Sequence, residues 1–399
     1  MAEGAFQSTD ADIKAYEDLY NFINGENTGW GKWDNSSYAD MDMPNYEAYL
    51  TQLEGEYDER TFVPDSMATV SANADKIFRE DVLAAALAAE EEFDLTPMIV
   101  NPNFDKDSAT GWKGTASGVS WDVNEHYNGA FDIYQDIEGL PEGTYKVCCD
   151  GFYRPANNDV CQAAWGVEGD TTNDVLAVLY GNDATQKLHH CYDVVFDEAH
   201  GGAAQITGIV DEAFNGKYAI NDRHGCSIVF PEGGFHNEVT CYVGADGKLR
   251  IGVKTIAGAN LLGGNWTPFD SFKISYIPGD VSGLIATLPS NVEAAQTMLN
   301  SEAVSTTEAK EGLDAAIVAA QGVLENGSTD ADELTAQSEA LIAAVEFGQK
   351  SIDKAAELAQ MVEQHVAAFD DTVYDVYMES DIYWDFSDFL LDELYDQID

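Results

Sequence analysis

Basic side chains are scarce in this sequence. Its 399 residues include 19 lysines and arginines against 72 aspartates and glutamates, which gives a formal net charge of −53. The imbalance is not local: residues 1–95 carry 22 acids and 5 bases, residues 96–280 carry 25 and 11, and residues 281–399 carry 25 and 3. Every region would repel a nucleic-acid backbone or an anionic membrane, so we exclude nucleic acid as a partner. The same charge attracts divalent cations.

Long apolar runs and a secretion signal are also missing. No stretch approaches the roughly 20 apolar residues that span a bilayer, so we predict no membrane insertion. The N-terminus, MAEGAFQSTDADIKAYEDLY, lacks the basic start and the apolar core of a leader. Either a leader has been removed, or the protein reaches its location without one.

Cysteine is confined to one part of the chain. All six cysteines lie between positions 148 and 241. The lack of a CxxC pair argues against a zinc ribbon. An even number permits disulfides in an oxidising compartment, but the spacings determine no pairing, and buried free thiols are the alternative. Cys148 and Cys149 are neighbours on a predicted strand and would point to opposite faces, so we expect no bond between them.

Signatures of catalysis are absent. The sequence contains no GxSxG, HExxH or P-loop pattern. Carboxylates are so frequent that a glycosidase pair cannot be identified among them. His189 and His190 stand beside Cys191, which hints at a metal, but a cluster without a second spaced partner is more typical of surface decoration. We therefore predict that the protein is not an enzyme.

The spacing of apolar residues changes along the chain. Helical periodicity runs through residues 1–93, interrupted by a turn-rich loop with Trp30 and Trp33. Residues 94–280 show glycine-rich turns and short alternating runs, and Asp246 and Gly247 form a hairpin signal between two of them. Strands at this density, without intervening helices, indicate an antiparallel β-sandwich.

Helical signals return over residues 281–366. SNVE at 290–293 and STTE at 305–308 are capping boxes, and each precedes an apolar periodic run. The alanine-rich stripes of these runs indicate a slender bundle. The predicted fold class is thus multidomain α+β, with a central antiparallel β-sandwich flanked by N- and C-terminal helical bundles.

The last predicted segment, residues 367–399, is both acidic and aromatic. Residues 370–399 contain eleven acids, seven aromatics and no base. So many large apolar groups argue against a disordered tail. The segment either packs on its own bundle or docks as an amphipathic helix on another subunit or assembly partner.

Six segments follow one another between residues 94 and 278: DLTPMIVNPNF, GW, FDIYQDIEGLPEGTYKV, GFYRP, GKLRIGVK and NWTPFDSFKISY. In this order they resemble the galactose-binding-like β-sandwich modules. These are jelly rolls related to non-catalytic carbohydrate-binding modules and are common in surface proteins of gut Bacteroidetes. Residues 286–350 resemble the FIVAR-type helical repeats of bacterial surface proteins, which serve as spacers. The resemblance implies a jelly roll over residues 94–280 and a FIVAR-like bundle over residues 281–366.

The resemblance also implies a structural calcium ion. In such jelly rolls calcium bridges the first strand region and an acid near the last strand, and it prefers oxygen ligands. Asn103 and Asp105 would supply the first part, and Asp270 matches the acid of the last strand. The alternative is that Asp105 and Asp107 only form a turn.

Sugar recognition requires aromatic faces and polar side chains that bond hydroxyl groups. Trp121, Tyr127, Arg154 and Trp165 lie in the less regular segments and are the candidates, whereas Tyr153 and Trp266 belong to strand motifs and are expected in the core.

Two functions from different classes follow. The first is a non-catalytic carbohydrate-binding or adhesion protein, extracellular or displayed at the cell surface, with helical spacers and glycans as partners. The alternative is a structural virion protein, a capsid-decorating or fibre protein of a phage of gut bacteria, that carries the same module. An oligomeric or assembly contact through residues 370–399 would suit the second function.

Overall fold

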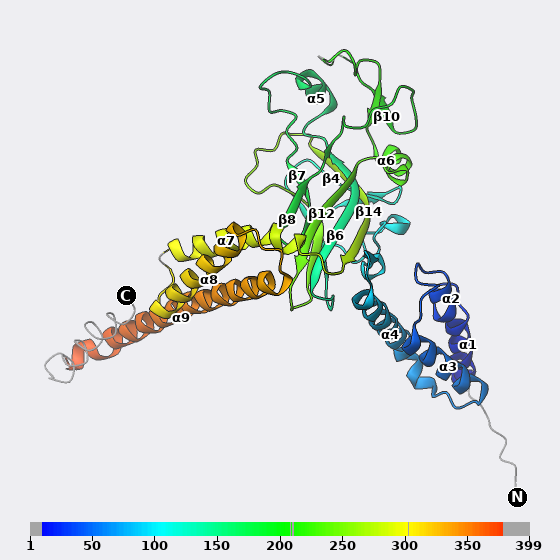
Figure 1. The fold of residues 1–399 in the computed structure, drawn as a ribbon, viewed down its shortest axis with the longest axis horizontal. Coiled ribbons are helices and arrows are strands. Elements are labelled where there is room, and N and C mark those ends of the chain that lie inside the picture. The colour runs from blue at the N-terminus through cyan, green and yellow to red at the C-terminus, as the bar shows by residue number, and fades with distance from the viewer. Residues whose placement is uncertain (1–9, 208, 210, 302, 378–399) are drawn as a thin grey trace, which may run out of the picture.

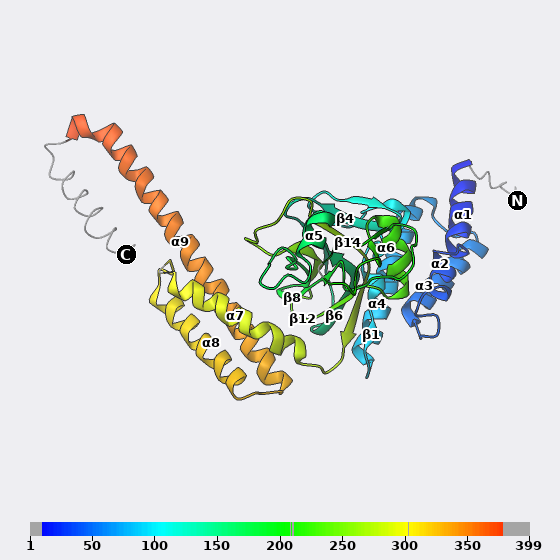
Figure 2. The same cartoon turned by 90° about the horizontal axis from the view of Figure 1, so that it is seen from above.

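The computed structural model describes residues 10–207, 209, 211–301 and 303–377. The protein is a mixed α/β structure with antiparallel sheets in the middle of the chain and helices at both ends. The sheets lie at the centre, and the N- and C-terminal helices project from them in different directions (Figures 1 and 2). Within the described residues, no helix is both long and apolar enough to cross a membrane.

The N-terminal helices form a small bundle. They are α1 (Asp10–Ile23), α2 (Gly29–Asp34), α3 (Pro44–Asp58), the 3-10 turn η1 (Pro64–Ser66) and α4 (Met67–Ala88). The stretch predicted as a loop therefore contains the short helix α2. Trp30 and Trp33 lie one helical turn apart, and their stacked rings have centroids 6.1 Å apart. The Trp33 ring also packs edge-on against buried Tyr46, so aromatic packing stabilises α2 within a turn-rich stretch.

A buried carboxylate joins two of these helices. Asp81 of α4 is 4% exposed, and it accepts hydrogen bonds from the backbone N–H groups of Asn45 and Tyr46 at 3.0 and 2.9 Å. It also accepts one from the Asn45 amide at 2.6 Å. The first turn of a helix has no internal acceptors for its N–H groups, and the residue before α3, Met43, cannot cap it by its side chain. Asp81 supplies that cap from α4.

The strands form two larger sheets and one pair. The first sheet contains β1 (Phe93–Asp94), β3 (Gly118–Ser120), β4 (Val123–Tyr127), β6 (Gly143–Tyr153), β9 (His189–His190), β12 (His236–Val243) and β14 (Trp266–Ile277), with β6 between β12 and β14. The second contains β2 (Lys113–Gly114), β5 (Asp132–Ile137), β7 (Ala177–Gly181), β8 (Ala184–Lys187) and β13 (Leu249–Thr255). β10 (Ala203–Gln205) pairs with β11 (Tyr218–Ile220). Of these pairings, β6 with β9 is parallel and the others are antiparallel.

The predicted hairpin at Asp246 and Gly247 is wrong. The turn exists, with Gly247 at a φ of +63°, but β12 pairs with β6 whereas β13 pairs with β5 and β7. The chain therefore passes from one sheet to the other. β12 and β13 are each apolar on one side, and both apolar sides contribute to the core between the sheets. The two sides can face each other across this core only if the strands lie in different sheets.

One apolar core links the two sheets and the N-terminal helices. Its fully buried members include Leu19, Tyr46, Phe104, Val147, Leu179, Cys241, Ile251 and Phe269. Tyr38 joins the helices to the sheet: its ring stacks on Phe93 at 5.9 Å, and its hydroxyl donates to the Asp94 carbonyl at 2.7 Å. The N-terminal helices are thus packed continuously onto the strands that follow them.

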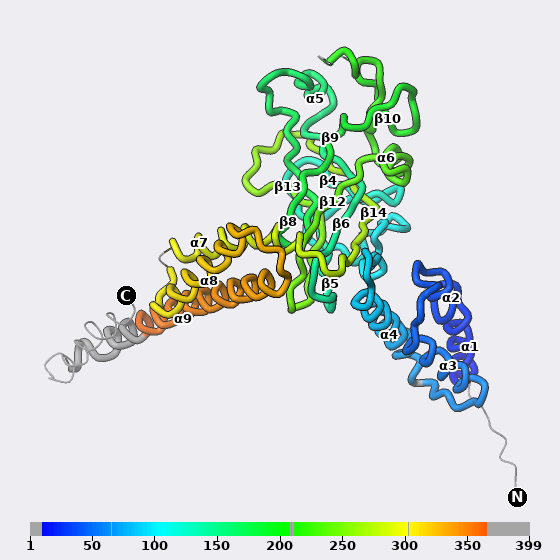
Figure 3. The backbone as a smooth tube through the Cα atoms, in the orientation of Figure 1, coloured from blue at the N-terminus to red at the C-terminus, as the bar shows by residue number. Residues whose placement is uncertain are grey.

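The connections at one end of the sheets form a second apolar cluster. They include α5 (Asn158–Ala164), α6 (Arg223–Val229) and the turn η4 (Phe230–Glu232), which lie with β10 at the top of Figures 1 and 3. The cluster contains Phe152, Cys161, Ile206, Cys226, Phe235 and Trp266. As expected, Tyr153 and Trp266 are buried. All six cysteines are buried free thiols, which decides between the two alternatives left open by their spacing.

The C-terminal part is a three-helix arrangement with its own core. It consists of α7 (Ser282–Asn300), α8 (Thr307–Glu325) and α9 (Ala331–Tyr377), packed through Leu288, Val292, Leu313, Ile317, Leu334 and Leu341. The capping box predicted at 290–293 is wrong, because α7 begins at Ser282 and contains Pro289 in its interior. The start predicted at 305–308 is shifted by one residue: Thr306 accepts from the Ala309 N–H at 3.3 Å.

The predicted docking segment, residues 370–399, falls largely outside the described part of the chain. The described part of the chain ends at residue 377, and its side chains are described up to residue 364. The 3-10 turns η2 (Thr96–Met98) and η3 (Asp105–Asp107) complete the elements and carry the region of the predicted calcium ligands.

Replacement of Asp81 by alanine should lower the free energy of unfolding by about 1–3 kcal/mol, because three donors at the start of α3 lose their buried acceptor. Urea denaturation followed by circular dichroism measures this. Glu80→Ala is the matched control, since the Glu80 side chain is 58% exposed and its removal should change stability by about 0.5 kcal/mol or less. Equal stability of the two variants would contradict the role assigned to Asp81.

Candidate functional site

Directly after β6 stands a buried arginine that has no carboxylate partner among the described residues. Arg154 exchanges backbone hydrogen bonds of 2.8 Å with Trp266, is 7% exposed, and places its guanidinium over the Trp266 ring at 4.9 Å. Its Nη1 donates to the amide oxygens of Asn221 at 3.0 Å and Asn158 at 3.4 Å. Its Nε is buried and unpaired, and no ion pair to Arg154 occurs among the described residues. A buried charge in this state is costly, which makes the position a candidate functional site.

Amide side chains surround this guanidinium. The Asn158 amide donates to Asn221 Oδ1 at 2.5 Å, and the Tyr127 hydroxyl donates to Asn157 Oδ1 at 3.4 Å. Asn157 and Asn221 are exposed, and their NH2 groups make no hydrogen bond within the described part of the chain. Because their oxygens are held from within the protein, these donors remain free for a ligand.

A carboxylate, that of Glu125, holds the Trp266 ring against which Arg154 packs. The Trp266 indole N–H donates to Glu125 Oε2 at 2.6 Å, and Glu125 Oε1 lies 3.4 Å from Arg223 Nη1. The neighbouring His224 ring lies 4.3 Å from the ring of Trp121. A series of side-chain contacts along β4 therefore links Arg154 and its asparagines to Trp121, which lies at the other end of the strand.

The four predicted sugar-contacting residues do not form one group. Tyr127, 55% exposed, and Arg154 are brought together through the asparagines, whereas Trp121, 59% exposed, lies beyond the opposite end of β4. β4 alone spans roughly 13 Å. Trp165 packs against the rings of His190, Tyr192 and Phe214 at 4.5, 5.1 and 5.6 Å.

Asn157, Asn158 and Asn221 were not predicted from the sequence. The only signal was the clustering of asparagines after the strand motifs, in RPANN and AIND, which is also typical of ordinary turns. Nothing in the sequence places the two segments beside one another, because they come together through the cluster formed by α5, β11 and α6.

Three carboxylates converge at the predicted calcium region. Asp270 of β14 is 9% exposed, and its Oδ2 accepts from Ser271 Oγ at 3.3 Å. Its Oδ1 is buried and has no hydrogen-bond partner among the described residues. Asp150 lies directly opposite Asp270 in β6. Burial, followed by the negative charges of Asp150 and Asp105, raises the pKa of Asp270 to about 7.

The loop that carries Asp105 has an unusual backbone. Phe104, Lys106 and Asp107 have φ of +51°, +60° and +53°, and Ser271 on the facing strand has +57°. Such left-handed conformations are rare for these residue types and persist only where the surroundings enforce them. The Asp105 carboxylate makes no hydrogen bond or ion pair within the described residues, so its oxygens remain available.

The neighbouring predicted residues behave differently. Asp107 is used in a turn: its N–H donates to Asp122 Oδ1 at 2.9 Å, and its Oδ1 accepts from the Asp122 N–H at 3.0 Å. Asn103 is exposed, and within the described residues it forms no hydrogen bond with Asp105 or Asp270. The all-oxygen donor set of Asp105, Asp150 and Asp270 is of the kind that a hard cation prefers, and an ion there would give the buried Asp270 oxygen a partner.

The two histidines of KLHHCYD, His189 and His190, are neighbours in β9 but differ in burial. His189 is half-exposed and pairs with Asp193 at 3.0 Å, but His190 is 5% exposed, so surface decoration is wrong for it. The Tyr192 N–H donates to His190 Nδ1 at 3.1 Å, which leaves Nε2–H to donate to Asn173 Oδ1 at 3.2 Å. Burial lowers the pKa of His190 to about 4.

His190 should make the fold sensitive to acid. The unfolded chain binds a proton near pH 6.5, but the folded protein does so only near pH 4, so stability present above pH 6.5 is lost as the pH falls through this window. The slope contributed by His190 is at most about 1.4 kcal/mol per pH unit. Urea denaturation at pH 7, 6, 5 and 4 should show a flatter profile for His190→Gln than for the wild type. Parallel profiles would contradict this origin of the pH dependence.

Comparisons with known proteins add no family. The chain matches no protein-family model, and a search of curated proteins finds no match. The assignment of function therefore rests on the geometry of the residues described above.

Proposed function

We propose that the protein is a non-catalytic carbohydrate-binding or adhesion protein, displayed outside the cell, whose glycan surface is formed by Tyr127, Asn157 and Asn221 around Arg154. The observation that carries this proposal is the buried Arg154 guanidinium, which within the described part of the chain has amide oxygens but no carboxylate as acceptors. A charge kept in this state orients the amides beside an exposed ring, and that is the combination a sugar requires.

Each group has a distinct role in this proposal. The exposed Tyr127 ring stacks on the C–H face of a pyranose, and the free NH2 groups of Asn157 and Asn221 donate to its hydroxyls. Arg154 acts as a positioning residue through Asn221 and Asn158. Trp121 provides a second exposed ring farther along β4 for a longer glycan, and Trp165 supports the surface from within the apolar cluster.

The architecture we propose is a galactose-binding-like jelly roll. The support is that two antiparallel sheets share one core and that the candidate surface lies where their connections gather. The FIVAR-like helices α7 to α9 serve as a spacer, and so does the N-terminal bundle. All of these parts are acidic, which suits a role away from anionic membranes.

Calcium is the proposed structural cofactor. Asp270 and Asp105 would hold the ion with Asp150 beside them, and Asn103 would flank it. When bound, the ion supplies a positive charge that offsets the buried carboxylates. The chain itself provides the left-handed loop that brings Asp105 near Asp270, which lies within β14.

Glycan binding should depend on the Tyr127 and Arg154 group. The full chain is screened on a glycan array with calcium, and variants are compared by calorimetry on the best glycan. Tyr127→Ala and Asn221→Ala should each lower affinity about tenfold or more, which corresponds to roughly 1.4 kcal/mol. Arg154→Lys should do likewise, because an ammonium cannot reproduce the guanidinium geometry.

Tyr20→Ala is the matched control, since Tyr20 is an equally exposed tyrosine (51%) on α1. A blank array from the folded chain, or binding unchanged in all three variants, would overturn the carbohydrate proposal.

Calcium should stabilise the folded wild type and so raise its melting temperature. At a calcium concentration of a hundred times Kd, the free energy of unfolding should rise by about 2.7 kcal/mol. Asp270→Asn should lose this gain, yet be at least as stable as the wild type in chelator, because it removes a buried negative charge. Differential scanning calorimetry measures both. Asp183→Asn, an exposed site on the β7–β8 turn, serves as control. An equal calcium response in Asp270→Asn and the wild type would sink this assignment.

A further inference from the structure

Four side chains that can bind or orient a metal share one face of the first sheet. β6 and β12 are paired so that Cys148 lies opposite Glu238 and Asp150 lies opposite His236. Side chains alternate along a strand, so residues two apart on two paired strands project from the same face as neighbours. The intervening Cys149 belongs to the core between the sheets, which directs the four others to the outer face.

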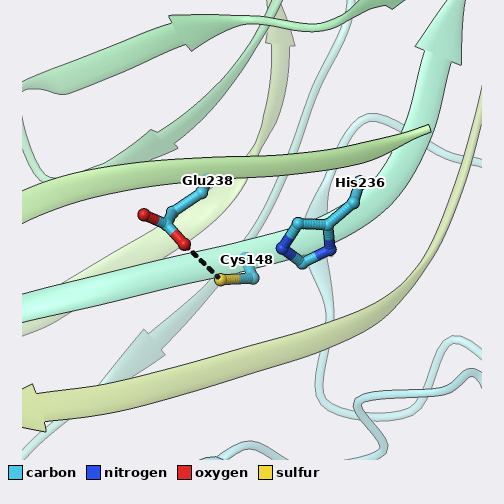
Figure 4. A group of neighbouring side chains, drawn as sticks. All are labelled: Cys148, His236 and Glu238. Carbon is cyan, nitrogen blue, oxygen red and sulfur yellow. Dashed lines mark hydrogen bonds between the residues drawn. The ribbon is translucent and has the colours of Figure 1, made fainter. Parts of the chain in front are cut away.

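The geometry of three of them is that of a nearly closed metal site. Cys148, His236 and Glu238 offer sulfur, nitrogen and oxygen atoms within 4.8 Å of one another, and Figure 4 shows His236 and Glu238 both reaching from β12 toward Cys148. The Cys148 Sγ to Glu238 Oε2 distance is 3.9 Å. In tetrahedral zinc sites, bonds of about 2.0–2.3 Å separate neighbouring ligand atoms by about 3.3–3.8 Å. A movement of about an ångström in the exposed histidine and glutamate closes the site.

A buried acid already orients the histidine. The Nδ1 atom of His236 lies 3.1 Å from Oδ1 of Asp150, which is 8% exposed. The other ring nitrogen, Nε2, makes no hydrogen bond within the described residues. A carboxylate on one imidazole nitrogen and a metal on the other is the arrangement that fixes the tautomer of metal-binding histidines.

We propose that Cys148, His236 and Glu238 bind one zinc ion, with Asp150 as the residue that orients His236. A thiolate and an imidazole select zinc over calcium, whereas the neighbouring Asp105 and Asp270 offer only oxygen. Three protein ligands leave a fourth tetrahedral position for water or another ligand. His236 and Glu238 also border a cavity of 420 Å³ next to β8 and β9.

Zinc binding would displace the proton of the Cys148 thiol and the ion pair between Glu238 and Lys146. Without a metal, burial and the charge of Glu238 raise the pKa of the Cys148 thiol to about 12, so the thiol is protonated and unreactive. Binding forms the sulfur–zinc bond and releases that proton to solvent. Glu238 also gives up a loose ion pair with Lys146 at 3.7 Å, but Lys146 retains Glu92 at 2.7 Å.

Cobalt(II) is the spectroscopic probe for this site. The full chain is titrated in excess calcium, which occupies sites made of oxygen alone. We expect one cobalt ion per chain, a thiolate-to-cobalt charge-transfer band, and loss of that band when zinc is added. Cys148→Ala should abolish the band, and His236→Gln should weaken cobalt binding at least tenfold. Asp150→Asn should reduce affinity about 10- to 100-fold while the band remains.

Cys226→Ala removes a different buried thiol, from α6, and should keep the band. Near-ultraviolet circular dichroism shows whether each variant is folded, and a zinc-induced rise in melting temperature in the wild type alone gives a second readout. Three outcomes would overturn the proposal: cobalt binding without a charge-transfer band, a band that persists in Cys148→Ala, or an equal thermal response to zinc in wild type and folded His236→Gln. Each is distinguishable from failure of glycan binding, which involves other residues, and from failure of calcium binding, because Cys148, His236 and Glu238 are not among the proposed calcium ligands and only Asp150 borders both sites.

Discussion

The register of β6 between β12 and β14 is the constraint on which the rest of this structure depends. The core between the sheets takes Val147 and Cys149 from one face of β6, and strict alternation then sends Cys148 and Asp150 to the other. The same register sets Asp150 against both Asp270 and His236. Where β6 ends, Arg154 meets Trp266. A shift by one residue would bury the polar face and expose the core, so packing and the candidate sites are determined together.

Two charged groups remain at positions that cost folding free energy. Arg154 is buried with no carboxylate partner among the residues that the structure describes, and Asp270 is buried near two other carboxylates, Asp105 and Asp150. Burial of a lone charge is unfavourable, and so is the approach of like charges. These are the positions where the local chemistry conflicts with stability, and such conflicts concentrate at functional sites. The cation site that we propose would offset the charge of Asp270, whereas the amide oxygens of Asn158 and Asn221 partly satisfy Arg154.

Sequence patterns predicted the elements better than their connections. Alternation located the strands, and the buried positions of Tyr153 and Trp266 are confirmed. The turn at Asp246 and Gly247 was predicted, but not the crossing between sheets, because turn chemistry is local and sheet membership is not. Proximity across the chain, such as Asn221 to Arg154 or Cys148 to His236, depends on register and on loop packing, which no short motif encodes.

The central claim is that a glycan contacts the surface around Arg154. Hydrogen–deuterium exchange on the full chain, with and without the glycan selected by the array, tests this location most directly. The account predicts that protection on binding is confined to residues near Tyr127, the Arg154 to Asn158 turn and Asn221, with no change in α7 to α9. Protection in the helical bundles, with none at these three segments, would contradict it.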